Sequence, residues 1–362
     1  MAIVNRAIEK QLILVPSVDL TIVPHETFPA NVDCELVSLA SHFRRSPPDD
    51  TQLHVRHGWP PRFSRPTRGH VILFQPWEYG WLPETYVKAM NAGIDELWVP
   101  STYVRDVYLT SMVKSERVQI IPYGVDSSLF TPCFSRSTGL RDSIFRFLFV
   151  GGLLYRKGVD CLLRAYIRFF HRTDDVVLVI KDVAQYGRNR YRDLIEDLRS
   201  DSCNPRIELI SDNLTEIEMV DLYRSCDCLV HPYRGEGFAL PVLEAMSCGL
   251  PVIVTLGGAT DDFVDDSCGF RISATKRTLG NREIMGLRCA GDPWLLEPSI
   301  SELGDTMLDV FRNPTKAKAL GAAARSKVTA AWTWKRTTDL ILSRMHVILA
   351  TDRSSSFQPP PI

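Results

Sequence analysis

The chain has 362 residues, of which 45% are hydrophobic and 23% are charged, with a formal net charge of -1. The length predicts two domains, and the composition is typical of a globular protein with a sizeable core. The absence of a basic excess argues against a nucleic acid or an anionic membrane as the main partner.

The first segment, MAIVNRAIEKQLILV, carries Arg6, Glu9 and Lys10 and contains no long apolar run. It therefore does not read as a secretory signal, and NRAIEKQLI predicts a helix. No stretch of the chain reaches the ~18 apolar residues of a membrane span. We expect a protein of the cytoplasm or of the cytosolic face of a membrane, without a transmembrane span in this chain.

The first domain is predicted to cover residues 1–130. VDLTIV, HVILF, IDELWVP and RVQIIPYG predict strands, and LPETYVKAM predicts a helix between them. A doubly wound domain usually begins with a strand and a glycine-rich turn, whereas this chain begins with a helix. The first domain is therefore expected to be short or incomplete.

A polar break at residues 127–144 separates this domain from a second one, predicted to cover residues 145–315. Its strands are FRFLFVGG, VVLVIKD, RIELIS, CDCLVHP and PVIVT, and they alternate with amphipathic helices. Strands rich in Val, Ile and Leu that alternate with helices predict an α/β fold with doubly wound parallel sheets. Residues 317–348 are predicted to form helices that pack across both domains, and residues 353–362 a disordered tail.

Nine cysteines are scattered along the chain without a CxxC spacing. This pattern indicates reduced, mostly buried thiols of a reducing compartment. Adjacent acids such as Asp261-Asp262 and Asp265-Asp266 are expected to face solvent, so the sequence predicts no metal site.

The unit CDCLVHPYRGEGFALPVLEAMSCGLPVIVT combines a strand, the loop YRGEG, a helix from about Ala239 to Ser247 that is capped by Gly249, and a second strand. In parallel α/β sheets, ligands bind beyond the carboxyl ends of the strands, where this loop is expected. A helix N-terminus favours an anion such as a phosphate. Gly235 and Gly237 would let backbone approach a ligand closely, and Pro241 is tolerated in the first turn.

Two acids flank this helix start, Glu236 in the loop and Glu244 within the helix. Eight residues at helical rise span about 12 Å, which suits a ligand that extends from a sugar to a ribose. A diphosphate would lie between the two carboxylates. Each glutamate alone is more often a solvated loop acid or an acid that complements the helix dipole.

The segment from Glu236 to Glu244 resembles the E-x7-E signature of retaining glycosyltransferases with the two-Rossmann, GT-B architecture (family 4 type, glycosyl transferases group 1). AMSCGLPVIVT, FLFVGGLLYRKGVDCLLRAY, IIPYGVDSSLF, GGATDDFVDDSCGF and TWKRTTDLI are similar to further motifs of that family, so the resemblance covers about residues 100–345. It implies two Rossmann-like domains that face a cleft.

The resemblance also implies the site residues. Glu236 and Lys157 would be catalytic, and the donor would be bound by Arg156, Gly152, Gly237, Phe238, Ala239, Leu240 and Glu244. Two departures stand out: many family members carry Arg where this chain has Gly152, and the acid after the GG turn is Asp262. Alone, RKG is as often a solvated helix start.

The acceptor side is less clear, because members often carry a histidine in the first domain. The candidates here are His25, His57 and the FQPWEYG loop with Gln75, Trp77 and Glu78. Trp77 and Trp81 could form a surface on which a sugar stacks. Each of these residues is more often structural than catalytic.

The implied activity is transfer of a sugar from a nucleoside diphosphate-sugar to a hydroxyl of a glycan, lipid or protein, with retention and without metal or cofactor. A non-catalytic relative that serves as a binding partner or scaffold is the main alternative. A nucleotide-sugar epimerase or sugar phosphorylase on the same scaffold is another. A dehydrogenase is disfavoured because no GxGxxG follows a strand.

Overall fold

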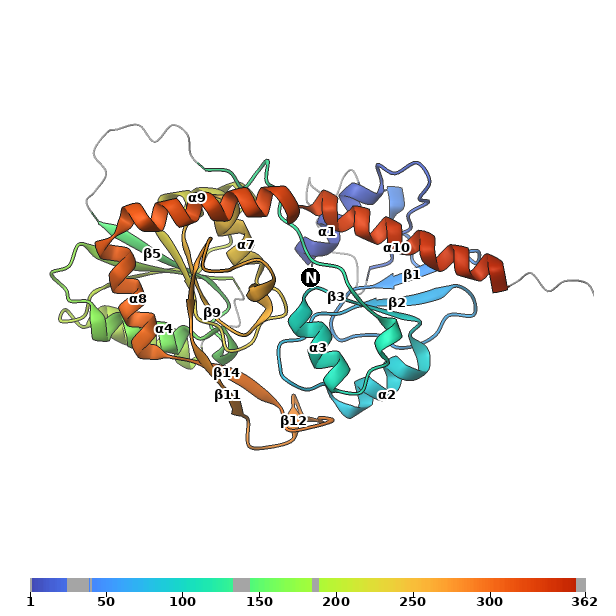
Figure 1. Ribbon diagram of the computed structural model, residues 1–362, viewed down its shortest axis with the longest axis horizontal. Coiled ribbons are helices and arrows are strands. Elements are labelled where there is room, and N and C mark those ends of the chain that lie inside the picture. Colours follow the sequence, from blue (N-terminus) through green and yellow to red (C-terminus); the bar gives the residue numbers. More distant parts are fainter. Residues whose placement is uncertain (1, 25–38, 40, 133–143, 184–188, 356–362) are drawn as a thin grey trace, which may run out of the picture.

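The computed structural model describes residues 2–24, 39, 41–132, 144–183 and 189–355, with side chains up to residue 351. Two α/β lobes lie side by side (Figure 1). We call residues 41–125, with the first and last helices, the N-lobe, and residues 144–331 the C-lobe. The α/β class with parallel sheets is confirmed.

The N-lobe contains a four-stranded parallel sheet whose spatial order is β1-β2-β3-β4. Its elements are β1 (Leu53–Arg56), β2 (His70–Phe74), α2 (Glu84–Gly93), β3 (Glu96–Val99), α3 (Thr102–Thr110), a 3-10 turn (Ser115–Arg117) and β4 (Val118–Ile120). Strands β2 and β3 are buried, as their continuous apolar runs predict. The strand predicted at VDLTIV is wrong: only an isolated bridge joins Ile22 to Phe43.

The C-lobe contains a six-stranded parallel sheet in the order β10-β9-β8-β5-β6-β7. Its strands are β5 (Phe145–Gly151), β6 (Val176–Asp182), β7 (Arg206–Ile210), β8 (Cys228–His231), β9 (Val252–Thr255) and β10 (Phe270–Ile272). Its helices include α4 (Val159–Phe169), α5 (Arg190–Ser200), α6 (Glu216–Ser225), α7 (Leu240–Ser247) and α8 (Ile300–Arg312). The winding direction reverses between β5 and β8, and such a switch point is where open α/β sheets bind ligands.

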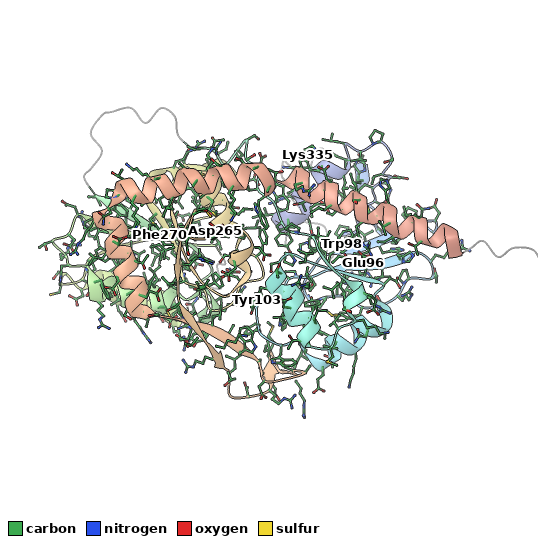
Figure 2. The ribbon with its side chains drawn as sticks, in the orientation of Figure 1. Glu96, Trp98, Tyr103, Asp265, Phe270 and Lys335 are labelled. Carbon is green, nitrogen blue, oxygen red and sulfur yellow. The ribbon has the colours of Figure 1, made fainter. Side chains whose placement is uncertain are left out.

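Two consecutive helices connect the lobes along one side (Figure 1). α9 (Pro314–Ala331) packs on α7, and α10 (Trp334–Ser355) packs on α1 (Ala2–Leu12). Arg344 on α10 pairs with Glu96 on β3 at 2.5 Å, and the indole of Trp98 donates to the same carboxylate at 2.9 Å (Figure 2). Because α10 ends at Ser355, residues 353–355 of the predicted disordered tail are helical, and the rest of that tail lies outside the described residues.

A β-arm, residues 274–298, projects from the C-lobe to the N-lobe. It consists of β11 (Ala274–Thr278) paired with β14 (Trp294–Pro298), and of a hairpin formed by β12 (Glu283–Ile284) and β13 (Leu287–Arg288). Ile284 and Cys289 are buried in the apolar core of the N-lobe. The ring of Trp294 meets Tyr103 of α3, which is labelled in Figure 2, edge to face. The sequence did not predict this second connection between the lobes.

The linker predicted at residues 127–144 is described only in part, because residues 133–143 lie outside the described ranges. Of the seven cysteines in the described ranges, none forms a disulfide, and all except Cys203 are buried. No helix in the part of the chain that the structure describes is long and apolar enough to cross a bilayer.

Candidate active site

A cleft of about 1000 Å³ lies between the lobes. The C-lobe contributes the ends of β5 and β6, the turn with Arg156 and Lys157, and the start of α7. The N-lobe contributes Pro76, Glu78, the segment 123–130 and one face of α1. The cleft therefore lies at the switch point of the C-lobe sheet.

Glu236 lines the cleft and is 5% exposed. Its carboxylate pairs with the ammonium group of Lys157, accepts a hydrogen bond from Nε2 of His231 at 2.8 Å, and lies 3.6 Å from Nη1 of Arg156. Burial alone would raise the pKa of Glu236, but these partners together hold it well below its usual range. Glu236 is therefore a fixed carboxylate at neutral pH.

The two cations stand on a 3-10 turn, Tyr155–Lys157, that follows β5. The turn ends at Gly158, whose φ is 72° and where a Cβ would lie 1.9 Å from the carbonyl oxygen of Pro232. Only glycine fits there, and its absence of a side chain lets the turn pack against the end of β8. The carbonyl of Arg156 accepts the N–H groups of Arg234 and Gly235, so the cation turn and the Glu236 loop are joined directly.

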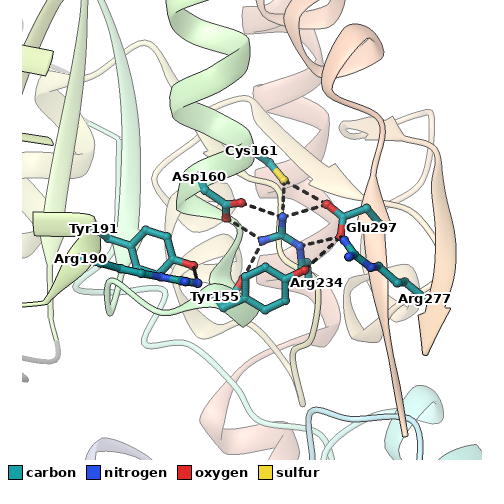
Figure 3. Close-up of polar contacts among 8 residues, drawn as sticks. All are labelled: Tyr155, Asp160, Cys161, Arg190, Tyr191, Arg234, Arg277 and Glu297. Carbon is teal, nitrogen blue, oxygen red and sulfur yellow. Dashed lines mark hydrogen bonds and ion pairs between the residues drawn. The ribbon is translucent and has the colours of Figure 1, made fainter. Parts of the chain in front are cut away.

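The buried side chain of Arg234 connects the cation turn and the Glu236 loop to the rest of the C-lobe (Figure 3). It is 2% exposed and donates to both oxygens of Asp160 at 2.6 and 2.8 Å and to both oxygens of Glu297 at 2.8 and 3.0 Å. Its guanidinium also lies 3.9 Å from the centre of the Tyr155 ring and donates to the carbonyl of Tyr155. The buried network therefore ties the cation turn, helix α4 and the β-arm to the Glu236 loop.

The predicted anion site at the start of α7 also faces the cleft, where Phe238, Ala239 and Leu240 line it. Ala239 adopts a left-handed conformation with φ 74°, and α7 begins at the next residue. The first helical turn leaves main-chain N–H groups without acceptors within the helix, which favours an anion there. The helix ends at Ser247, and Gly249 just beyond it adopts φ 75°, in keeping with its predicted capping role.

Glu244 lines the cleft one turn further along α7. Its carboxyl accepts a hydrogen bond from the hydroxyl of Tyr223 at 2.7 Å. Burial raises the pKa of Glu244 to about 7, and the Tyr223 bond acts in the opposite direction. The two glutamates thus have opposite electrostatic surroundings, with Glu236 held ionised and Glu244 close to its midpoint at neutral pH.

The two glycines predicted to bind the donor are placed differently relative to the cleft. Gly152 does not line the described cleft, because its neighbour Gly151 occupies that position at the end of β5. Gly237 lines the cleft, but a Cβ there would lie 2.8 Å from the ring of Pro76, so its missing side chain serves contact with the N-lobe. Gly235 likewise packs against the N-lobe, because a Cβ there would lie 2.3 Å from the carbonyl oxygen of Glu78.

The acceptor-side predictions have mixed outcomes. Glu78 lines the cleft, and one oxygen of its carboxylate lies 3.2 Å from Nη2 of Arg156. Trp77 is 1% exposed and packs in the N-lobe core, and Trp81 does not line the cleft either, so the stacking surface predicted for them does not form there. His57 lies behind the cleft wall, where it contacts Tyr123 at 3.0 Å, and burial lowers its pKa to about 3. His25 lies outside the described residues.

Asp262 was expected to face solvent, and this expectation is wrong. Its carboxylate accepts the N–H of Thr102, at the start of α3 in the other lobe, at 2.7 Å. The preceding residue, Ser101, donates to the carbonyl of Gly237 at 2.8 Å. The N-terminus of α3 therefore contacts two segments of the C-lobe, the Glu236 loop at Gly237 and the turn at Asp262.

Two buried residues of the site escaped sequence reasoning, His231 and Arg234. Both belong to the HPYRGEG segment, but a single histidine at a strand end is usually a core residue, and a loop arginine is usually solvated. The one sequence signal for a role in the site was their closeness to Glu236: His231 lies five residues before it and Arg234 two residues before it. Among the described residues, no group of three or more His, Cys, Asp or Glu side chains is arranged to hold a metal ion.

Comparison with known proteins agrees with this geometry. Residues 144–279 match the family described as Glycosyl transferases group 1. The match therefore covers the greater part of the C-lobe, from β5 to β11. The chain is 23% identical over 287 residues to the GDP-mannose-dependent monoacylated alpha-(1-6)-phosphatidylinositol monomannoside mannosyltransferase of Corynebacterium glutamicum, and the alignment covers 74% of this chain and 66% of that protein. It is 31% identical over 150 residues to D-inositol 3-phosphate glycosyltransferase of Pseudarthrobacter chlorophenolicus, and this alignment covers 40% of this chain and 35% of that protein.

The chain thus spans about a third to two thirds of the length of these curated relatives. Solved structures share the two-lobed fold of this chain. Sucrose-phosphate synthase from Thermosynechococcus elongatus superposes with a TM-score of 0.62 at 19% identity, covering 78% of this chain and 69% of that one. HepE of Anabaena, in complex with UDP-glucose, superposes with a TM-score of 0.61 at 16% identity, covering 77% and 72%. The GT-B architecture predicted from sequence is confirmed.

Proposed function

We propose that this chain is a glycosyltransferase that moves a sugar from a nucleoside diphosphate-sugar to an acceptor hydroxyl, with retention of configuration and without a metal ion. One observation carries the proposal: Lys157, Arg156, Glu236 and the start of α7 converge on one wall of the interlobe cleft. Two cations beside a helix N-terminus suit a diphosphate. The family of the C-lobe and the names of its relatives support the same activity.

Each residue has a role in this proposal. Lys157 and Arg156 bind the diphosphate and stabilise the charge that grows on it as the bond between the anomeric carbon and the phosphate oxygen breaks. Glu236 orients the sugar and favours positive charge at the anomeric carbon. The acceptor oxygen attacks from the face that the diphosphate leaves, and its proton passes to a diphosphate oxygen. No strong protein base is needed, and retention follows from the shared face.

Glu244 would bind the ribose of the donor, because an ionised carboxylate accepts hydrogen bonds from two hydroxyls. The printed names of structural and sequence relatives include UDP-glucose and GDP-mannose. UDP-sugars and GDP-sugars are therefore the first donors to test. The acceptor, a glycan, lipid or protein, would enter between the start of α7 and the N-lobe segment 123–130.

The alternative is a non-catalytic protein that binds a nucleotide in the same cleft but does not transfer a sugar. The surroundings of Glu236 favour the enzyme, because three buried or half-buried groups hold that carboxylate in one position. Such an arrangement has a cost in desolvation that nucleotide binding alone does not require.

Turnover separates the two functions. The protein is incubated with UDP-glucose, GDP-mannose and ADP-glucose, with and without acceptor mixtures, and nucleotide release is followed. We expect release by the wild type and at least about a hundredfold less by Glu236→Gln, which keeps the shape and removes the charge. Nucleotide binding without release, or equal release by both proteins, would contradict a role in sugar transfer.

A further inference from the structure

One contact of the cleft is unexpected for a diphosphate site, and it involves Glu78 of the N-lobe. Nη2 of Arg156 lies 3.2 Å from the Glu78 carboxylate, while Nη1 of the same side chain lies 3.6 Å from Glu236. Lys157 pairs with Glu236. Two cations and two carboxylates therefore balance, and a doubly charged diphosphate would meet repulsion as well as attraction.

One of the two carboxylates must move if the cations are to bind a diphosphate, and Glu236 is the poorer candidate. Its side chain is 6% exposed and is held by His231 as well as by both cations. Protonation is not a route either, because its partners hold the pKa of Glu236 low. The Glu78 side chain is 24% exposed, and among the described residues its carboxylate pairs with Arg156 alone.

The backbone of Glu78 is fixed even though its side chain can turn. Its carbonyl oxygen packs against Gly235, where a Cβ would lie 2.3 Å from it. Two residues later, the N–H of Gly80 donates to the carbonyl of Trp294 in the β-arm at 2.9 Å. The loop is therefore held between the Glu236 loop and the β-arm, and the Glu78 carboxylate is presented to Arg156 by the scaffold.

We propose that Glu78 is a built-in competitor of the donor diphosphate, which must displace the Glu78 carboxylate from Arg156 in order to bind. This inference rests on the proposed function, since it assumes a diphosphate at Arg156 and Lys157. Its consequence is opposite to that of an ordinary binding residue: removal of the Glu78 charge strengthens nucleotide binding. Displacement by rotation of one side chain would also leave the other contacts between the lobes in place, such as the bond from Ser101 to Gly237.

The test is calorimetric titration of the full chain with UDP, GDP and inorganic pyrophosphate. The variant Glu78→Gln keeps the size of the side chain and removes its charge. Glu116→Gln is the matched control, because Glu116 is an exposed acid of the same lobe, in the turn Ser115–Arg117. We expect Glu78→Gln to bind at least one nucleotide, and pyrophosphate, about tenfold more tightly than the wild type. Glu116→Gln should match the wild type.

The outcomes are distinct. Equal or weaker binding by Glu78→Gln, with a wild type that binds, would overturn the role of Glu78 and leave the proposed function intact. Tightening for UDP or GDP without tightening for pyrophosphate would also overturn it, because the effect would then lie away from the phosphates. If neither protein binds any of the three ligands, the proposed function fails, and this inference fails with it.

Discussion

Replacement of Arg234 by methionine tests whether the buried network stabilises the site. Arg234→Met keeps an apolar stem but leaves the carboxylates of Asp160 and Glu297 facing each other, with side chains 11% and 26% exposed. Removal of one member of a buried ion pair typically costs 3–5 kcal/mol. Because both carboxylates keep some access to water, we expect the lower end, a loss of about 3 kcal/mol in the free energy of unfolding.

Arg277→Met is the matched control, because Arg277 contacts the same carboxylate of Glu297, at 3.4 Å, but is 66% exposed. Exposed ion pairs contribute little, so we expect a loss below about 1 kcal/mol. Denaturant unfolding followed by tryptophan fluorescence gives both values. A loss for Arg234→Met within about 1 kcal/mol of that for Arg277→Met at pH 7 would refute the reasoning.

The pH dependence gives a second check on the same pair of variants. Burial would raise the pKa values of Asp160 and Glu297, but Arg234 holds both below their usual range. Their contribution to stability is therefore present above the unfolded pKa values, near 4, and is lost as pH falls through the lowered folded values. In Arg234→Met the buried carboxylates can take up protons, so the loss of stability should shrink as pH falls from 7 towards about 4.

Three further predictions concern other parts of the molecule. Ile284→Ala removes a buried side chain in the tip of the β-arm and should lower the free energy of unfolding by about 2–4 kcal/mol. Met285→Ala, at an exposed position of the same tip, should change it by less than about 0.5 kcal/mol. Equal effects of the two substitutions in denaturant unfolding would show that the arm is not docked. Nucleotide affinity should weaken by about tenfold from pH 8 to pH 6, because Glu244 has a pKa of about 7 and must be ionised to bind ribose. In calorimetry, Glu244→Gln should lose this pH dependence. A pH dependence retained by Glu244→Gln would exclude Glu244 as its source. His231→Phe removes the hydrogen bond that holds the Glu236 carboxylate. It should lower kcat by about tenfold or more, while nucleotide affinity changes by less than about threefold. A fall in nucleotide affinity with unchanged kcat would contradict the role of His231 in positioning Glu236.

The C-lobe follows closely from its sequence. Strands β5, β6, β8 and β9 are buried on both faces and read as continuous apolar runs, and the helices between them show the 3.6-residue period. VDLTIV has the same composition as a strand but forms none, because strand formation depends on a partner along the sheet edge as well as on propensity. Short apolar runs do not contain that information.

The β-arm could not be predicted for a related reason. β11 has the polar sequence ATKRT, and all of its residues are exposed or half-buried. Its position depends on pairing with β14, sixteen or more residues away, and on two apolar side chains that enter the core of the other lobe. Such long-range contacts leave no local periodicity.

The candidate site was predicted in part. Arg156, Lys157, Glu236 and Glu244 reach one cleft, as their motif spacing and the expected switch point indicate. The contact of Glu236 with His231 was not foreseen, because burial of His231 depends on the rings of Phe149 and Tyr233 that flank it. The ion pair between Glu78 and Arg156 joins two lobes, and its geometry is fixed only when the loops pack together.

A structure of the protein with bound UDP or GDP tests the central claim most directly. The account predicts phosphate oxygens within about 3 Å of Lys157 Nζ and of the first main-chain N–H groups of α7, with ribose hydroxyls at Glu244. It also predicts that the Glu78 carboxylate has turned away from Arg156. A nucleotide bound elsewhere in the cleft, with Lys157 still paired to Glu236 and far from both phosphates, would contradict the account.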